Sequence, residues 1–518
     1  MAATWLDNAV FYEIYPQSFM DSNADGIGDI PGMTAKLDYI QGLGCNALWI
    51  NPCFDSPFQD AGYDIRDYKL VAPRYGTNED LIHFFEEAHR RGIRVLLDLV
   101  PCHTSETHPW FQASCRDTPN AYSHRYIWTD CCWEQPQGLP FVGGEAPRDG
   151  CYILSFFKCQ PALNFGFGTP TAPWQHKAGS PATLDTRQAI WDVMKFWLER
   201  GCDGFRVDMA GALVKNDTPD QAYTQAVYRD LRERLDREFP EAALVSEWNA
   251  PRHALGCGFD MDFYLSWTGN GYHSLMRSYD PKSKDTPIGP DRSYFKADSG
   301  ADPMHFLGEY LPNYLETCGK GLWCFLTCNH DTVRPRFNLT PEELKLAYSF
   351  LFTMPGAPFL YYGDEIGMRY RRLPSKEGGY NRTGSRTPMQ WSAGKNLGFS
   401  ESEPEKLYLP VDPAADAPTV QAQEADPNSL LNYTKAIIAL RHSQPDLQAR
   451  SPFQVYFAQP GSRLLAYRRG RLLCAVNPGQ EEQSLDLDRP YRILFSHGPV
   501  SLTGRTLHMQ GFAVLAPQ

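Results

Sequence analysis

Four apolar segments of this chain end on an ionisable side chain, and this pattern constrains the fold more than any other. They are LLDLVPCH, which ends at His103, GFRVD, which ends at Asp208, ALVSE, which ends at Glu247, and FLTCNHD, which ends at Asp331. Each has the character of a buried β-strand. In a closed barrel of parallel strands, side chains at the carboxyl ends of distant strands meet at one mouth. The pattern therefore predicts a barrel whose acids converge on one pocket.

Eight segments in all have the length and apolar character of buried strands. They cover residues 10–16, 46–51, 93–100, 204–208, 243–247, 261–265, 323–328 and 358–363. The segments between them place apolar residues at helical spacing, for example at Ile190, Val193 and Trp197. Strand and helix in alternation indicate a parallel α/β sheet, and eight repeats close it. We therefore expect a (β/α)8 TIM barrel.

The spacing of the repeats predicts two further regions. Between the third and fourth strands, residues 104–169 are rich in Trp, Tyr, Pro, Gly and Cys, which predicts an irregular lobe inserted over the mouth of the barrel. After the last helical pattern, residues 446–518 show short alternating runs, which predict a C-terminal all-β sandwich. The barrel itself is then expected to comprise residues 1–103 and 170–445.

Composition and charge exclude several classes of protein. The net charge is −12 with acids and bases interspersed, so a nucleic-acid partner is not expected. No apolar run approaches the roughly 20 residues of a membrane span. The first residues, MAATWLDNAVFYEIYP, lack the pattern of a secretion signal, which predicts a cytoplasmic location. No motif indicates the oligomeric state.

The cysteines are expected to be structural. There are 14 of them, scattered without any CxxC pair, and several lie within or beside apolar runs. This arrangement favours reduced thiols in the core over disulfides or zinc ligands, which stay open as less favoured alternatives.

The strand-end segments also resemble a known family. DLVPCH, GFRVD, SEWN and CNHD are similar, in order and position, to the four characteristic motifs of the α-amylase family of glycoside hydrolases. The flanking segments YPQSFMDSNADGIGDIPG, GYDIRDY, QPALNF and RTPMQW are closer to its oligo-1,6-glucosidase, α-glucosidase and trehalose synthase branch than to the endo-acting amylases. The resemblance covers nearly the whole chain and implies a small oligosaccharide or disaccharide as substrate.

The chemistry of such an enzyme requires two acids in opposite protonation states. Retaining hydrolysis uses one carboxylate as nucleophile and a second carboxyl group, about 5 Å away, as proton donor. Asp208 follows Arg206 by two residues on the same face of a strand, so we expect Arg206 to keep Asp208 ionised as the nucleophile. Glu247, beside that charge and Trp248, is expected to have a raised pKa and to donate the proton.

The resemblance implies roles for further residues. Asp331 is similar to the residue that stabilises the transition state, and His103 and His330 to residues that bind sugar hydroxyls. In GYDIRDY, Tyr63 is expected to stack on the terminal sugar and Asp64 to bind its far hydroxyls beside Arg382 or Arg386. Such an acid and arginine would close the pocket beyond the terminal sugar and make the enzyme exo-acting.

The segment DSNADGIGD predicts a structural cation site. Asp21, Asn23, Asp25, the carbonyl group of Ile27 and Asp29 place oxygen ligands at alternate positions around glycines, which is the pattern of a calcium loop. Magnesium, or a loop with no ion, remains an alternative. No organic cofactor is implied.

A second calcium site that α-amylases carry is not expected. The reason is that Cys102 and Ala162 stand where its ligands would be.

Three functional hypotheses follow. The first is a retaining exo-α-glucosidase that acts on short gluco-oligosaccharides or disaccharides. The second is a trehalose synthase-like isomerase or transglucosidase, in which a sugar takes the place of water. The third, more remote, is a non-catalytic amylase-like interaction protein. The known proteins of this kind have lost the catalytic acids and carry a membrane helix. Met209, directly after Asp208, leaves the linkage preference open.

Overall fold

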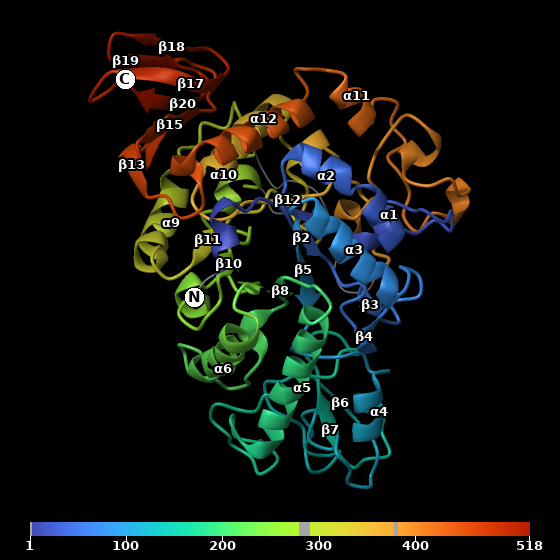
Figure 1. The fold of residues 1–518 in the computed structure, drawn as a ribbon. Helices are drawn as coiled ribbons and strands as arrows, with labels where there is room; N and C mark the ends of the chain where they lie inside the picture. The colour runs from blue at the N-terminus through green and yellow to red at the C-terminus, as the bar shows by residue number, and fades with distance from the viewer. Residues whose placement is uncertain (1–2, 279–290, 378–381) are drawn as a thin grey trace.

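The computed structural model describes residues 3–278, 291–377 and 382–518. Within these residues, a single sheet of eight parallel strands occupies the middle of the molecule (Figure 1), in the order β11-β10-β9-β8-β5-β2-β1-β12. A parallel bridge from Leu326 to Phe359 joins the two outer strands, so the sheet closes into a barrel. The predicted (β/α)8 barrel is confirmed.

The eight barrel strands are the eight segments expected from the sequence. They are β1 (Phe11–Ile14), β2 (Ala47–Ile50), β5 (Arg94–Leu99), β8 (Gly204–Val207), β9 (Ala243–Ser246), β10 (Met261–Phe263), β11 (Leu322–Cys324) and β12 (Phe359–Tyr361). Each is shorter than its apolar run, because the residues that follow the strand form the loops at the barrel mouth.

Helices surround the sheet (Figure 1). They are α1 (Ile30–Ala35), α2 (Leu37–Leu43), α3 (Asn78–Arg90), α5 (Pro181–Leu198), α6 (Ala222–Glu238), α7 (Pro251–Ala254), α8 (His273–Met276), α9 (Met304–Thr317), α10 (Pro341–Thr353), α11 (Val420–Glu424) and α12 (Leu430–Ser443). Local signals set several starts: Thr77 and Asp80 form a capping box at α3, as Thr340 and Glu343 do at α10. These caps satisfy backbone N–H groups that the first helical turn leaves without partners.

The inward face of the strands changes character along the barrel axis. At the amino-terminal end, Phe11, Trp49, Leu96, Val245 and Phe359 belong to one buried hydrophobic cluster. Successive side chains of a strand point to opposite faces, so the next inward positions lie two residues further on. Those positions carry Glu13, Asn51, Asp98 and Glu247. An apolar plug therefore lies beneath a layer of ionisable groups.

The inserted lobe stands at one end of the molecule. It contains α4 (Pro109–Ser114) and the antiparallel pair β6 (Phe141–Gly143) and β7 (Cys151–Ile153), with irregular segments between them. A hydrophobic cluster of its own includes Ile127, Ile153 and Phe167. A short hairpin of β3 (Phe54–Asp55) and β4 (Asp67–Val71) lies next to the lobe (Figure 1).

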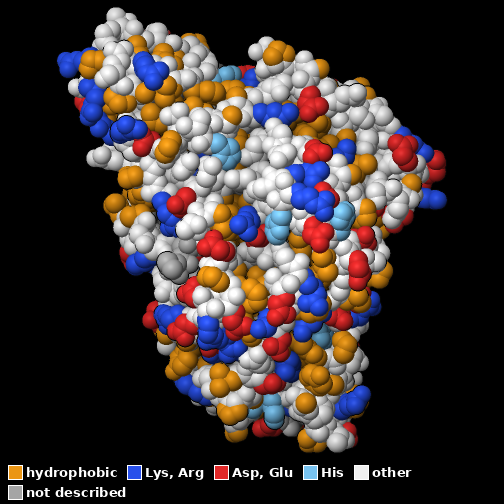
Figure 2. All heavy atoms as spheres, in the orientation of Figure 1, with side chains coloured by type: hydrophobic (Ala, Val, Ile, Leu, Met, Phe, Trp, Pro, Cys, Tyr) orange, Lys and Arg blue, Asp and Glu red, His pale blue; other side chains and the backbone are white. Residues whose placement is uncertain are grey.

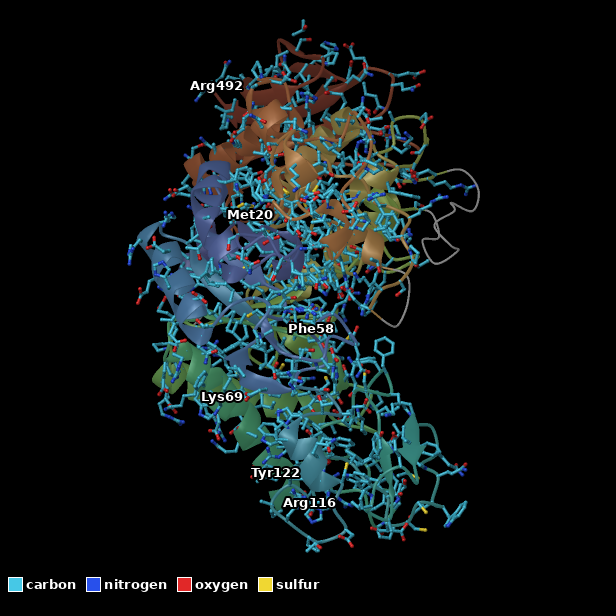
Figure 3. All side chains as sticks on the ribbon, turned by 90° about the vertical axis from the view of Figure 1, so that its right-hand side faces the viewer. Met20, Phe58, Lys69, Arg116, Tyr122 and Arg492 are labelled. Carbon is cyan, nitrogen blue, oxygen red and sulfur yellow. The ribbon has the colours of Figure 1, made fainter. Side chains whose placement is uncertain are left out.

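The C-terminal region consists of two antiparallel sheets, as expected. One has the order β13-β14-β15-β20-β17 and the other β16-β19-β18. The strands are β13 (Phe453–Phe457), β14 (Leu465–Arg469), β15 (Leu472–Asn477), β16 (Gln483–Asp486), β17 (Tyr491–His497), β18 (Val500–Thr503), β19 (Thr506–Met509) and β20 (Gly511–Pro517). Figure 3 shows Arg492 of this region at the end opposite to Arg116 and Tyr122 of the lobe. The exact boundaries of the three regions stay predictions.

The surface carries mixed charge. On the face shown in Figure 2, Lys and Arg side chains lie interspersed with Asp and Glu. In the part of the chain that the structure describes, no helix has the length and apolar character needed to cross a membrane.

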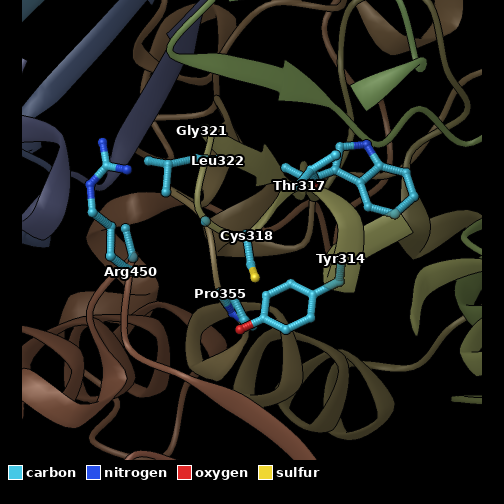
Figure 4. A pocket seen from close by; sticks show the side chains of 10 residues that line it. Tyr314, Thr317, Cys318, Gly321, Leu322, Pro355 and Arg450 are labelled. Atoms are coloured by element: carbon cyan, nitrogen blue, oxygen red, sulfur yellow. The ribbon is translucent and has the colours of Figure 1, made fainter. Parts of the chain in front are cut away.

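One cavity lies at the opposite end of the barrel from the acids (Figure 4). It is lined by Tyr314, Thr317, Cys318, Gly321, Leu322, Trp323, Pro355, Gly356, Ala449 and Arg450. Leu322 is the first residue of β11, whereas Asp331 follows its carboxyl end. This cavity is therefore separate from the ionisable cluster.

Candidate active site

Arg206 on β8 is the centre of the ionisable layer. One terminal nitrogen of its guanidinium lies 2.7 Å from Asp98 and 2.9 Å from Asp208, and the other lies 2.7 Å from Glu247. The register places Asp98 of β5 beside Arg206 of β8, and Glu247 directly follows β9. Three adjacent strands therefore deliver three carboxyl groups to one cation.

Exposure separates the acids that can meet a substrate from those that cannot. The side chains of Asp208 and Glu247 retain 10% and 12% of their accessible surface, and that of Asp331 retains 23%. Those of Asp98 and Arg206 retain 0% and 1%. The first three acids therefore face solvent at the barrel mouth, and the other two groups support them from below.

The protonation of this cluster differs in one respect from the expectation. Burial raises the pKa of Asp208 well above its usual range, although Arg206 acts against this rise, and Glu247 and Asp98 add to it. Burial also raises the pKa of Asp98 to about 6, again against Arg206. One guanidinium thus offsets only part of the charge of the carboxyl groups around it. Asp98 and Asp208 therefore titrate together and retain a proton in weakly acidic solution.

Asp331 lies in the opposite electrostatic environment. Its Oδ1 lies 2.9 Å from Arg382 and 2.7 Å from Arg386, and its Oδ2 lies 3.7 Å from His330. Burial alone would raise the pKa of Asp331, but the guanidinium groups of Arg382 and Arg386 outweigh it and hold the pKa far below its usual range. Asp331 is therefore a fixed anion.

His330 and Tyr63 form a stacked pair beneath the site. Their rings lie 5.3 Å apart, and the Tyr63 hydroxyl lies 2.7 Å from His330 Nε2. Nδ1 of His330 lies 2.9 Å from Glu13 and 3.1 Å from the Asn51 amide. Burial lowers the pKa of His330 well below its usual range, so the ring is neutral. The Tyr63 hydroxyl also donates to Asp98, which joins this pair to the Arg206 cluster.

His103 approaches the same site from β5. Its Nε2 lies 3.1 Å from the Tyr63 carbonyl group, and its ring meets Phe156 of the lobe edge-on at 5.7 Å. Burial lowers the pKa of His103 to about 3, so this imidazole is neutral as well. The Phe156 side chain is 42% exposed, which makes it the aromatic face that the lobe presents beside the site.

The structure places Asp64 differently from the expectation. Its carboxylate is fully buried and accepts hydrogen bonds from the Ser56 hydroxyl and from the backbone N–H groups of Gln59 and Asp60. It forms no ion pair with Arg382 or Arg386 among the described residues. Its oxygens are already occupied by the tight turn that precedes GYDI, so Asp64 holds the turn together.

Asp60 takes the position that was expected for Asp64. Its carboxylate pairs with the same Arg382 guanidinium that contacts Asp331, and its other oxygen accepts from Gln160 at 2.7 Å. Arg386 instead bonds Asp331 and Glu377, the latter at 2.6 Å. Both arginines therefore lie at the site, but only Arg382 links the first loop acid to Asp331.

Sequence reasoning missed five polar residues of the site: Glu13, Asn51, Asp60, Asp98 and Glu377. The sequence pattern could have identified three of them. Glu13, Asn51 and Asp98 lie near the carboxyl ends of apolar strands, as the predicted catalytic acids do. For Asp60 and Glu377 no local pattern distinguishes them from surface loop residues.

The predicted cation loop forms a tight turn before α1. Asp21 Oδ1 accepts from the N–H groups of Asn23 and Ala24, and Asp25 Oδ1 accepts from Ile27. Asp29 caps α1 by accepting from Gly32. The side-chain oxygens of Asn23 and Asp25 each accept at most one N–H, so they keep a lone pair that fits Ca²⁺ or Mg²⁺. Each Asp21 oxygen, by contrast, already accepts two hydrogen bonds.

Known proteins are similar to this chain. Residues 13–449 match the alpha amylase catalytic domain. The chain is 32% identical over 553 residues to a trehalose synthase/amylase TreS of Mycobacterium tuberculosis (strain CDC 1551 / Oshkosh), over 97% of this chain and 86% of that protein. It is 32% identical over 495 residues to an oligo-1,6-glucosidase of Heyndrickxia coagulans, over 85% of each.

Solved structures agree with these matches. The alpha-glucosyl transfer enzyme XgtA is similar, with a TM-score of 0.79, 26% identity and 99% of both chains covered. A mutant of MutB in complex with glucose has a TM-score of 0.80 and 25% identity over 100% of both chains. Together with the barrel and the acids at its mouth, these matches show that the chain belongs to the α-amylase family and is a glycoside hydrolase of the branch that contains oligo-1,6-glucosidases and trehalose synthases.

Proposed function

We propose that the protein is a retaining, exo-acting α-glucosidase that hydrolyses short gluco-oligosaccharides or disaccharides. The observation that carries this proposal is the pair Asp208 and Glu247, held by the two terminal nitrogens of the Arg206 guanidinium. Retention requires two carboxyl groups about 5 Å apart, so that both reach one sugar. The binding of both acids to one guanidinium supports such a separation.

The proposed reaction has two steps. Asp208 attacks the anomeric carbon while Glu247 gives its proton to the leaving oxygen, which breaks the glycosidic bond and leaves a glycosyl ester on Asp208. Glu247, now ionised, takes a proton from water, and that water releases the sugar with its original configuration. The fixed charge of Asp331 favours the positive character of the sugar in both transition states.

The exo-acting mode is supported by the contact between Asp60 and Arg382. This ion pair joins the loop after β2 to the segment after β12, and Arg382 also contacts Asp331. A sugar chain that entered past Asp208 would meet this bridge, so one terminal glucose fits and a continuing chain does not. Asp60 and Arg382 would then bind the hydroxyls of that terminal sugar, and the Tyr63 ring would stack on it.

A second candidate is transfer to a sugar in place of hydrolysis. The relative that aligns over 97% of this chain is a trehalose synthase/amylase, and XgtA is an alpha-glucosyl transfer enzyme. The same glycosyl ester serves both outcomes, and the acceptor decides between them. We therefore propose an isomerase or transglucosidase activity as the alternative.

The test uses variants of the two acids with an aryl α-glucoside. Asp208→Asn is expected to lower kcat by at least about 10⁴-fold, because the nucleophile is lost. In Glu247→Gln, azide is expected to restore turnover and to yield the α-glucosyl azide by attack on the ester. The proposal fails if Asp208→Asn keeps its activity, or if NMR of the wild-type reaction shows the β-anomer formed first.

Product analysis separates the two candidates. Incubation with maltose is expected to give glucose alone if hydrolysis dominates, whereas trehalose or longer oligosaccharides would favour transfer. A panel of maltose, isomaltose, sucrose, trehalose and soluble starch tests the exo-acting mode, because the Asp60 to Arg382 bridge predicts little turnover of starch.

We further propose that the loop from Asp21 to Asp29 binds Ca²⁺ with a structural role only. Asp25 is the informative position, because its side chain is exposed and holds only the loop itself. Calcium is expected to raise the Tm of the wild type and not that of Asp25→Ala, while kcat stays unchanged in both. Equal responses of the two proteins to calcium or a chelator would exclude this site.

A further inference from the structure

We propose that Cys131, Cys132 and Asp149 of the inserted lobe form a binding site for Zn²⁺ or another thiophilic divalent cation. One ligand atom from each of the three residues lies within 4.8 Å of the others. Within the described residues this is the only such group of three His, Cys, Asp or Glu ligands. Cysteine sulfur and carboxylate oxygen are both ligands that zinc binds in proteins.

The local backbone already holds the ligands in place. Cys131 and Cys132 lie in a turn closed by a hydrogen bond from the Glu134 N–H to the Cys131 carbonyl group at 3.0 Å. Asp149 is held against this turn because its Oδ1 accepts from the Cys132 N–H at 2.7 Å. That bond uses one carboxylate oxygen and leaves Oδ2 for a ligand. The three side chains are therefore positioned by backbone contacts that a bound ion would not disturb.

A second observation concerns the sulfur atom of Cys131. It accepts a hydrogen bond from the Trp133 N–H at 3.4 Å. This contact fixes the direction of the sulfur atom, as outer hydrogen bonds do for metal ligands. The negative charge of Asp149 also favours a bound cation, because in the described part of the chain no Lys or Arg forms an ion pair with this carboxylate.

The three ligands are also accessible. Cys131 and Cys132 are half-buried and Asp149 is exposed, so an ion can reach them from solvent. By contrast, most other cysteines are buried among apolar side chains. Three protein ligands leave the fourth position of a tetrahedral ion to water.

The site would brace the lobe. Cys132 precedes β6 and Asp149 lies between β6 and β7, so an ion bound to both closes the segment 132–149, which contains β6. The same lobe carries Phe156, which lies against His103 at the candidate active site. Binding of the ion to the folded state alone raises stability by an amount that grows with the logarithm of the ion concentration divided by Kd. The expected effect is therefore a higher Tm with little change in the chemical step.

The experiment measures zinc bound to the full-length, reduced protein by equilibrium dialysis and elemental analysis. The wild type is expected to bind one zinc ion at this site, and Cys132→Ser and Asp149→Ala to weaken that binding at least about tenfold, since each removes one ligand. Cadmium provides an independent readout, because each bound thiolate adds to an ultraviolet charge-transfer band, which should be weaker in the serine variant. Zinc should raise the Tm of the wild type and not that of either variant.

Two control variants exclude binding elsewhere. Cys318→Ser removes an exposed thiol at the far end of the barrel and is expected to bind zinc as the wild type does. Asp208→Asn removes an acid of the candidate active site and is expected to keep the zinc as well. The proposal is overturned if the reduced wild type binds no zinc, or if Cys132→Ser and Asp149→Ala, folded by circular dichroism, bind it with unchanged affinity.

Discussion

At the scale of single residues, two acids of one short loop have different tasks. Asp60 pairs with Arg382 at the site, whereas Asp64 is enclosed by a hydroxyl and two backbone N–H groups. Both are buried carboxylates in the same segment, so composition alone does not distinguish them. What separates them is the donor that each one meets: a guanidinium from a distant loop for Asp60, and its own turn for Asp64.

Substitution of these two acids should separate binding from stability. Asp60→Asn is expected to lower kcat/KM for short α-glucosides by about 10²-fold or more, because a charged contact at the site is lost, with little change in Tm. Asp64→Asn should lower the free energy of unfolding by about 2 kcal/mol, because an amide accepts fewer of the three hydrogen bonds. Steady-state kinetics and thermal unfolding of both variants provide the check. The reverse pattern would assign the site to Asp64.

Asp98 should influence the pH dependence although it does not reach solvent. As pH falls through about 6, the Arg206 cluster takes up a proton, so fewer molecules hold Asp208 ionised and kcat/KM falls on the acid side. Asp98→Asn removes one competitor for Arg206, which lowers the pKa of Asp208. The acid limb of the kcat/KM profile is therefore expected to move to lower pH. An unchanged limb would show that Asp98 is not coupled to the nucleophile.

At the scale of secondary-structure elements, buried polar contacts join the first strand to its neighbours. The Tyr12 hydroxyl on β1 and the Tyr39 hydroxyl on α2 both donate to Glu365 at 2.7 Å. Glu365 lies in the turn after β12, so one carboxyl group ties together three elements that are far apart in the sequence. Burial raises the pKa of Glu365 to about 7.

This raised pKa predicts a pH-dependent stability. Between the unfolded pKa of about 4.3 and the folded pKa of about 7, the folded state holds a proton that the unfolded state has released. Stability therefore falls as pH rises through this window and is level above it. Glu365→Gln keeps an acceptor without a charge, so it should match the wild type near pH 4 and exceed it by about 3–4 kcal/mol at pH 8. Denaturant unfolding at both pH values is the measurement.

At the scale of the whole molecule, the C-terminal sheets are continuous with the barrel. Buried Tyr467 and Phe512 of these sheets belong to the same hydrophobic cluster as the helices around the barrel. Arg469 of β14 is fully buried and donates to the carbonyl groups of Thr353 and Gln448. Thr353 is the last residue of α10, so a cation of one region caps a helix of another and favours its dipole.

Removal of the contacts that Arg469 makes at the end of α10 should lower the stability of the barrel and the C-terminal sheets together. Arg469→Met keeps most of the side-chain volume but leaves buried carbonyl groups without donors, which is expected to cost about 3 kcal/mol. Calorimetry should show a single transition at a lower Tm, because the two regions share a core. Arg471→Met, at an exposed neighbouring position, serves as the control and should leave Tm unchanged. Two separate transitions in the Arg469 variant would contradict the shared core.

Much of the barrel and the catalytic acids follow from local pattern. An apolar strand with period-two alternation fixes which side chains face inward, and a parallel barrel brings their carboxyl ends together. Asp208, Glu247 and Asp331 could therefore be placed at one mouth from the sequence by itself. The cysteines show where this reasoning stops: all 14 are free, but Cys131 and Cys132 lie beside Asp149 and outside the core.

What the tertiary structure alone decided is the choice of partners. The pairing of Asp60 with Arg382, and the meeting of Cys132 with Asp149, join segments that backbone periodicity does not relate. Short-range pattern depends on the geometry of one strand or helix, whereas a partner from a distant loop depends on how the whole chain packs. The sequence therefore determined the elements and their inward faces, and the packed chain determined which charges neutralise one another.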